Sequence, residues 1–190
     1  MLFVYYTTTG YASEGDGAGG YNQVQVGYVQ TSNTIFPGIS LISPTSSDGG
    51  SQYDIEYLTM KDGNNDWWIR VNGEWIGRYP KSLFHSSGLQ DQADMYQWYG
   101  EIYDGNAPSP TSTDLGSGQL PSAGWTHAAY FRNVARFTNN SGSNAFDATG
   151  AGNEQDAACY ATDTPSTSGD PTWQNWAFFG GPGDEGAGCN

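Results

Sequence analysis

One carboxylate in the sequence is set among side chains that suit catalysis. Glu101 lies in the segment 95–103, which reads MYQWYGEIY. If this segment is a strand, its side chains alternate between two faces, and one of them is apolar enough to join a core. The other face places Glu101 between Tyr99 and Tyr103 and in line with Gln97. Such a surface suits an aromatic groove in which Glu101 acts as a general acid or base, and the alternative is a half-exposed strand whose glutamate simply meets water.

A second carboxylate would complete this chemistry. Two carboxyl groups that converge on one water molecule can divide the work of general base and general acid when their surroundings separate their pKa values. Glu56 lies on a predicted strand and shares a face with Asp54. It is either a catalytic partner or an exposed, solvated charge opposite Lys61 or Arg70, and we favour the second interpretation.

Other catalytic classes fit the sequence poorly. There is no G-x-S-x-G motif and only two histidines occur, so a serine hydrolase is not expected. Residues 126–137 are predicted to form a strand on which His127 is a hydrogen-bonded core residue. A zinc site lacks its motifs, and the oxygen-rich segment 62–66 is interpreted as a hairpin turn because Trp67 stands where an EF-hand loop needs glycine. We therefore expect no metal and no cofactor.

The elements that must position Glu101 are short strands. The chain has 190 residues, 15% aromatic residues and 27 glycines, which favours one β-rich domain over residues 1–190. The clearest signal is an antiparallel meander, in which Asn72-Gly73 predicts a type I′ turn. We predict an all-β antiparallel sandwich of two packed sheets with little more helix than one or two turns in 80–92. The predicted strands are 2–9, 21–30, 35–42 (bent or at an edge), 52–60, 66–71, 74–79, 95–103, 126–137 and 173–179.

The charge and the cysteine content limit which partners and which cellular location are expected. The net charge of -14 would repel nucleic acid and anionic lipid surfaces, and no stretch is long and apolar enough to span a membrane. The excess of carboxylates suits an acidic extracellular medium. An even count of two cysteines, Cys159 and Cys189, favours one disulfide near the C-terminus, with free buried thiols as the alternative. The expected export signal is not found at the start of this sequence.

A series of motifs along the chain resembles the neprosin family. In order they are YN at 21–22, GYVQ at 27–30, QYDI at 52–55, KD at 61–62 with WW at 67–68, GRYP at 77–80 with LF at 83–84, WYGE at 98–101, GSG at 116–118, AYFRN at 129–133 and FFGGPG at 178–183. The resemblance covers nearly all 190 residues. Several linked motifs in one order are more specific than any of them alone.

This resemblance implies a secreted glutamic peptidase that cuts next to proline in acid with a pair of glutamates and no metal. It implies a β-sandwich with a groove across one sheet. The WYGE segment is similar to the Trp-Gly-Gly-Glu motif of the family, which makes Glu101 one of the two catalytic glutamates. Gln97, Tyr99, Tyr103 and Tyr53 are then the residues expected to bind a proline-containing peptide, and Cys159 and Cys189 resemble the C-terminal disulfide of the family.

The sequence departs from the family pattern at two places. Gly20 and Gln25 stand where a second family disulfide would have its cysteines. The other catalytic glutamate of the family lies in a Glu-Ala-Gly-Trp stretch just ahead of the segment that matches Leu2 to Thr9, so we expect it, and the first strands of the domain, upstream of Met1. The alternative to a peptidase is a non-catalytic β-sandwich module that binds a peptide or a glycan. A weaker alternative is a glycoside hydrolase with paired carboxylates.

Overall fold

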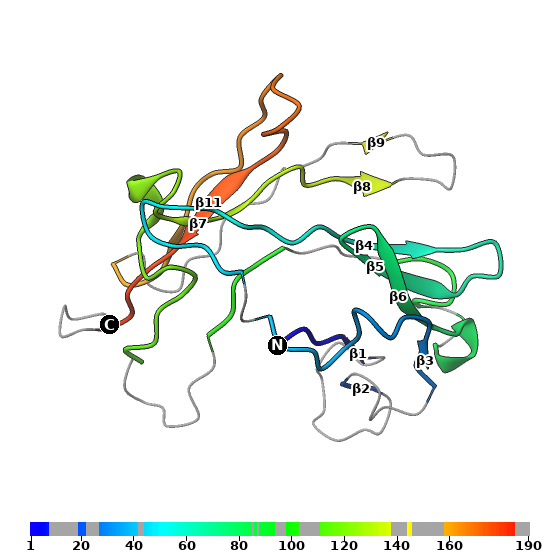
Figure 1. Cartoon of the computed structure of the whole chain (residues 1–190). Coiled ribbons are helices and arrows are strands. Elements are labelled where there is room, and N and C mark those ends of the chain that lie inside the picture. Colours follow the sequence, from blue (N-terminus) through cyan, green and yellow to red (C-terminus); the bar gives the residue numbers. More distant parts are fainter. Residues whose placement is uncertain are drawn as a thin grey trace. The chain divides into compact units, whose positions relative to one another are not determined.

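The computed structural model shows a chain built from short antiparallel strands (Figure 1). It describes residues 1–7, 19–21, 27–41, 44–84, 86, 88–93, 98–102, 111–137, 144–145 and 158–184. The chain forms two compact units: the first comprises Met1–Thr45 and Tyr53–Tyr96, and the second Ser46–Gln52 and Gln97–Asn190. The prediction of an all-β fold made of antiparallel sheets is confirmed. The single domain over 1–190 and the packing of two sheets against each other stay predictions, because each unit is described by itself.

The first unit is organised around a four-stranded sheet in the order β3-β6-β5-β4. Its strands are β3 (Val29–Gln30), β4 (Tyr57–Lys61), β5 (Trp67–Val71) and β6 (Glu74–Tyr79). The turn between β5 and β6 has φ angles of 47° at Asn72 and 80° at Gly73, which are the positive values that a type I′ hairpin requires. The predicted meander and its Asn-Gly turn are therefore confirmed, although β4 begins at Tyr57 and not at Gln52.

One face of this sheet forms the core of the first unit. Alternation along β5 turns Ile69 and Val71 inward, and Ile76 of β6 is fully buried beside them. A 3₁₀-helix, η2 (Lys81–Leu83), follows β6 and leads to the buried Phe84, which confirms the predicted helical turn. Several half-buried side chains pack against this core, namely Leu2, Val4, Tyr28, Ile35, Trp67, Leu83 and Leu89.

The N-terminal part of the first unit has less strand than predicted. Strand β1 (Tyr5–Thr7) pairs with β2 (Gly19–Tyr21), so the predicted strand 2–9 is confirmed only in part. The predicted strand over 35–42 is wrong for residues 35–41, which contain no strand, and residue 42 lies outside the described residues. The reason is local, because Pro37 donates no backbone hydrogen bond and Gly38 turns the chain with a φ of 98°.

The second unit contains a three-stranded sheet in the order β10-β11-β7 and a separate pair, β8 with β9. The bounds are β7 (Ala129–Phe131), β8 (Arg136–Phe137), β9 (Asn144–Ala145), β10 (Ala161–Thr162) and β11 (Ala177–Gly180), and a 3₁₀-helix, η3 (Pro121–Ala123), precedes β7. The last predicted strand, 173–179, is confirmed only for residues 177–179, which belong to β11, because residues 173–175 form bends and Trp176 only an isolated bridge with Ser166. The predicted strand 126–137 is wrong as one element, because Thr126 has a φ of 74° and Asn133 a φ of 54°, and these left-handed residues interrupt it on both sides of β7.

Aromatic side chains cover both faces of the pair β7 and β11. On one face the rings of Phe131 and Phe179 stack with centroids 4.5 Å apart and an interplanar angle of 16°. On the other face Tyr130 and Phe178 belong to a cluster of tilted and edge-to-face rings. That cluster is completed by the tryptophans Trp125, Trp173 and Trp176. The alternation of β-strand side chains therefore gives this short sheet two aromatic surfaces.

Candidate functional site

Glu101 lies in the second unit on an extended segment that is not part of a sheet. The described residues 98–102 form no strand, and none of their backbone groups makes a hydrogen bond within the described part of the chain. The predicted strand over 95–103 is therefore wrong for these residues, because no strand in the described part of the chain pairs with them to complete a ladder. Residues 94–97 and 103–110 lie outside the described residues, so Gln97 and Tyr103 stay predictions.

Gly100 fixes the position of this segment by packing. A Cβ atom at Gly100 would lie 2.8 Å from Leu115 Cδ1 and 2.8 Å from Phe179 Cε2, so the backbone next to Glu101 rests directly on these side chains. Phe179 is itself held by its stack on Phe131, and Leu115 is held by two backbone hydrogen bonds with Gly181, of 2.9 Å and 3.2 Å. Glu101 is thus the residue next to Gly100, whose backbone packs on the side chains of Leu115 and Phe179.

The side chains beside Gly100 face away from that surface. Tyr99 is 57% exposed and Glu101 is also exposed, whereas Ile102 is half-buried. The exposed Tyr99 and Glu101 side chains leave a phenol ring and a carboxylate open to a ligand. Trp98 is 38% exposed, so the apolar face predicted for this segment is only partly covered by the described residues.

The remaining predicted site residues are not brought together with Glu101 by the described contacts. Tyr53 is 50% exposed and belongs to the first unit. Glu56, also in the first unit, places its Oε1 atom 2.7 Å from Arg70 Nη2, and its side chain is 63% exposed. The interpretation of Glu56 as an exposed charge opposite Arg70 is thus confirmed.

Two further expectations concern cysteine and histidine. Cys159 is 1% exposed and there is no free cysteine among the described residues, while Cys189 lies outside them, so the pairing of the two stays a prediction. The expectation that His127 is a core residue is wrong. Its side chain is 45% exposed and its Nδ1 atom lies 2.9 Å from Asp48 Oδ1, because His127 sits in the turn before β7 and not on a strand.

Sequence reasoning missed a pocket on the first unit, on the sheet face opposite the core. We name it the indole pocket; its volume is about 550 Å³ and its walls are Thr31, Met60, Asp62, Trp68 and Trp75. The two indole rings meet edge to face, with centroids 5.8 Å apart at an interplanar angle of 79°. One sequence signal could have indicated this pocket. Trp68 and Arg70 lie two residues apart on β5, and the next strand after the Asn-Gly turn carries Trp75 and Arg78.

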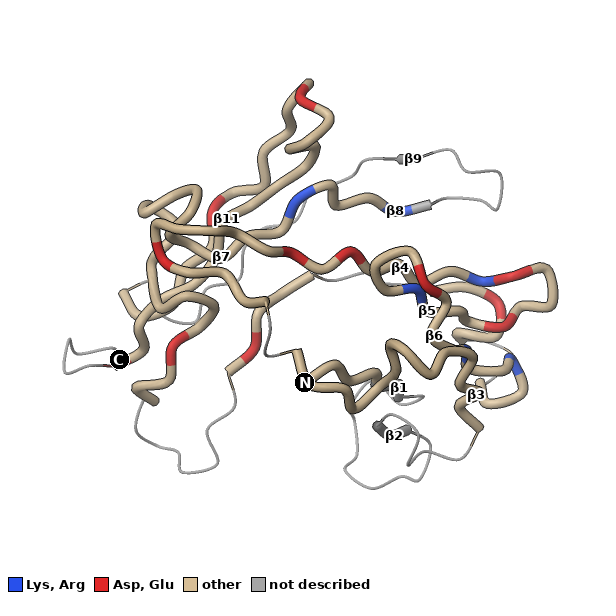
Figure 2. The backbone as a smooth tube through the Cα atoms, viewed as in Figure 1, with Lys and Arg blue, Asp and Glu red and all other residues tan. Residues whose placement is uncertain are grey.

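Two arginines alternate with these tryptophans across β5 and β6. Trp68 is paired with Arg78 and Arg70 with Trp75 in the register of the strands. The guanidinium of Arg78 lies 5.3 Å from the centre of the Trp68 ring, and that of Arg70 lies 5.7 Å from the Trp75 ring. Four of the six Lys and Arg residues of the chain lie within residues 61–81, and Figure 2 marks both basic and acidic positions along the backbone in the region of β4, β5 and β6.

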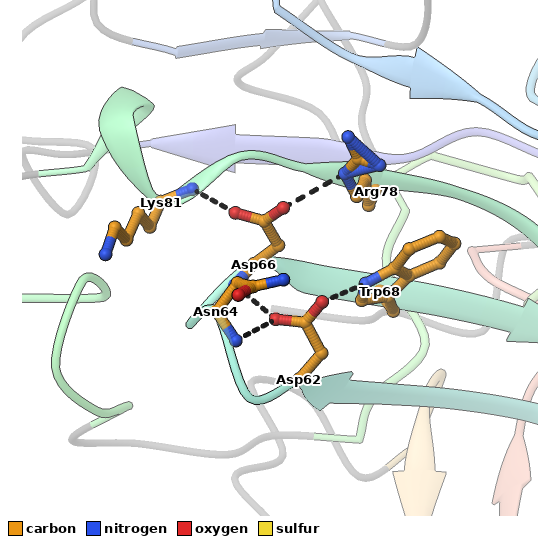
Figure 3. Close-up of polar contacts among 6 residues, drawn as sticks. All are labelled: Asp62, Asn64, Asp66, Trp68, Arg78 and Lys81. Carbon is orange, nitrogen blue, oxygen red and sulfur yellow. Dashed lines mark hydrogen bonds and ion pairs between the residues drawn. The ribbon is translucent and has the colours of Figure 1, made fainter.

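Asp62 is held in place at the edge of the pocket by three hydrogen bonds (Figure 3). Its Oδ1 atom accepts from the backbone amides of Asn64 and Asp66, at 2.8 Å and 3.0 Å, and its Oδ2 atom accepts from Trp68 Nε1 at 2.9 Å. Burial raises the pKa of Asp62, but these hydrogen bonds and the charge of Arg78 outweigh burial and lower the pKa below its ordinary value. The segment 62–66 is therefore a turn closed by its own aspartate, as predicted.

The described residues contain neither a metal-binding group of side chains nor a membrane-spanning helix. Among them, no three His, Cys, Asp or Glu side chains are grouped closely enough to hold a metal ion. No helix within the described ranges is long and apolar enough to cross a membrane. The sequence model of one protein family, described as Neprosin, matches residues 1–182 of the chain.

Proposed function

The chain belongs to the Neprosin family, and from this premise we propose that it is a glutamic endopeptidase that cleaves proline-containing peptides in acid, with Glu101 as one of its two catalytic carboxyl groups. One observation carries the assignment of Glu101 as the catalytic residue. Its carboxylate is exposed, while the glycine before it is seated on Leu115 and Phe179, so a reactive group is presented from an ordered surface.

The reaction needs no group beyond water and two carboxyls. In one assignment Glu101 is the base, which accepts a proton from water as the water oxygen forms a bond to the peptide carbonyl carbon. The bond from that carbon to nitrogen then breaks, while a second carboxyl delivers a proton to the leaving nitrogen. In the reverse assignment Glu101 is the acid that protonates the nitrogen.

Substrate binding is the second part of the proposal. The exposed ring of Tyr99 stands next to Glu101 and can pack against a proline ring, which is apolar and has no N–H to satisfy. Tyr103, Gln97 and Tyr53 are proposed as further peptide-binding residues, following the family resemblance. No charged pocket is needed for such a substrate.

We place this enzyme outside the cell, where a disulfide between Cys159 and Cys189 would be stable. The burial of Cys159 and the lack of a free cysteine among the described residues support that pairing. A disulfide there would tie the C-terminal segment to Cys159, two residues before β10. Mass spectrometry of the unreduced protein after proteolysis tests the pairing, and a free thiol at both positions would contradict it.

The catalytic proposal is tested by peptide cleavage near pH 4, about the pKa of a glutamate in a model peptide. The wild-type chain and the same chain extended upstream in its reading frame are incubated with a proline-containing peptide, and the products are identified by mass spectrometry. In the form that cleaves, Glu101→Gln should reduce the rate by about 10²- to 10⁴-fold, because a positioned acid or base contributes that much.

Glu56→Gln is the matched control, because the Glu56 carboxylate is bound to Arg70. This variant should retain the wild-type rate. Cleavage by Glu101→Gln at the wild-type rate would contradict the role of Glu101. No cleavage by either wild-type form would overturn the proposal and favour a non-catalytic binding module.

A further inference from the structure

The shape of the indole pocket fits a ligand larger than a single side chain. Trp68 and Trp75 meet at 79°, so one ring forms a floor and the other a wall, and Met60 adds a third apolar surface. The volume of about 550 Å³ lies in the range of small-molecule sites, which are mostly apolar with a few placed polar groups. The pocket belongs wholly to the first unit, whereas Glu101 belongs to the second.

The charges around the pocket favour a neutral ligand. Each indole ring already has a guanidinium near its face, from Arg78 and Arg70, so a cationic ligand would meet two like charges. Those guanidinium groups are in turn bound by carboxylates, Arg78 by Asp66 at 3.0 Å and Arg70 by Glu56 at 2.7 Å. An anionic ligand would meet the carboxylate of Asp62 in the wall.

The polar atoms of the wall favour a ligand with several hydrogen-bond donors. The Thr31 hydroxyl donates its proton to the backbone oxygen of Trp75 at 2.7 Å, so its remaining capacity is to accept. The Asp62 carboxylate accepts three hydrogen bonds and retains about one further acceptor position. Its lowered pKa keeps it ionised, and hence an acceptor, in mild acid. Trp75 Nε1 makes no hydrogen bond with any described residue and can donate.

We propose that the indole pocket binds a neutral oligosaccharide of hexopyranose units. Such a sugar presents an apolar C–H face to an indole ring and hydroxyl groups that can donate to Thr31 and Asp62 and accept from Trp75 Nε1. A proline ring packs on tryptophan equally well, but it brings no donor for these acceptors. The site therefore differs in ligand class from a groove for proline-containing peptides.

The proposal is tested on the full chain with cellotetraose and mannotetraose, by calorimetry and by the quenching of tryptophan fluorescence. Saturable binding of at least one of these sugars is expected. Trp75→Ala should weaken it about tenfold or more, as the loss of a tryptophan at the centre of a binding site usually does. Thr31→Val, which removes one hydroxyl and little volume, should weaken it about fivefold.

Two controls separate this site from the rest of the molecule. Trp125→Ala removes an indole that is 47% exposed in the second unit and should leave sugar affinity unchanged. Glu101→Gln should also retain it, so that loss of cleavage and loss of sugar binding are independent results. If Trp75→Ala fails to fold, Trp75→Phe tests the Nε1 donor, with an expected weakening of about fivefold.

Three results would overturn the proposal. One is the absence of saturable binding of both sugars to the wild-type chain. Another is an equal loss of affinity in Trp125→Ala and Trp75→Ala. The third is binding of choline or of a proline-rich peptide that is lost in Trp75→Ala while neither sugar competes for the site.

Discussion

In the first unit the strands β4, β5 and β6 follow one another along the chain, whereas in the second unit β7 pairs with β11, which lies far along the chain. Each turn of the meander is closed by residues within it, by Asp62 at one end and by Asn72-Gly73 at the other. In the second unit β10 and β11 also follow one another, through residues 163–176, but β7 pairs with β11 across a long separation in the sequence. That part of the sheet depends on contacts between distant segments, as where Leu115 bonds to Gly181.

This difference separates the two kinds of site that the units carry. The indole pocket is built on consecutive strands, so its tryptophans are placed by hairpin register and alternation. Glu101 is placed by a close approach of Gly100 to side chains of two other segments. Changes to local pairing should therefore act on the pocket, and changes to distant packing on Glu101.

The largest effect should come from the core beneath the pocket. Ile76 is fully buried, so Ile76→Ala should lower the free energy of unfolding of the first unit by about 2–5 kcal/mol through lost burial and the cavity that remains. Denaturant unfolding measures the loss, and hydrogen exchange of the β5 and β6 amides locates it. Ile55→Ala, at a position that is 40% exposed, is the control and should cost less than about 1 kcal/mol. Equal costs at both positions would contradict the assignment of the core.

A smaller effect on stability, but a direct one on catalysis, is expected at Gly100. The Cβ atom in Gly100→Ala would press on Leu115 and Phe179, and overpacking of this kind costs about 1–3 kcal/mol. The displaced backbone should also move Glu101 and reduce the rate of peptide cleavage. Gly169→Ala in the same unit is the matched control, because nothing lies within 4 Å of its added Cβ. A Gly100→Ala variant with wild-type cleavage would show that this contact does not position Glu101.

The same contrast explains what could be predicted of the fold. Period-two alternation and turn chemistry are local, so they located β5, the type I′ turn and β6 at nearly the correct residues. The strand expected over 126–137 was wrong because Thr126 and Asn133 adopt left-handed conformations that depend on the surrounding structure. The strand expected around Glu101 was wrong for 98–102, because aromatic alternation does not supply a pairing partner.

The site was predictable to a similar extent. Alternation placed Tyr99 and Glu101 on an exposed face, and the structure exposes both. The seat of Gly100 on Leu115 and Phe179 depends on segments far apart in the sequence, which no local pattern connects. The indole pocket was missed because Trp68 and Trp75 meet only after the register of β5 and β6 is fixed, including its irregularity between Ile69 and Arg70.

The smallest effect should appear as a dependence on pH in the turn that closes the meander. The pKa of Asp62 is lowered in the folded chain from the ordinary value of 3.8, so its contribution to stability is complete above that pH and is lost as the pH falls through the folded pKa. Asp62→Asn should therefore lower the melting temperature near pH 6, and the difference from wild type should shrink as the pH falls below 3.8. Thermal unfolding followed by circular dichroism between pH 6 and 2 measures this. Asp91→Asn, which changes an exposed carboxylate without a hydrogen bond to any described residue, is the control. If the difference in melting temperature between wild type and Asp62→Asn stays constant across this range, the charge of Asp62 does not stabilise the turn or the strands that carry the pocket.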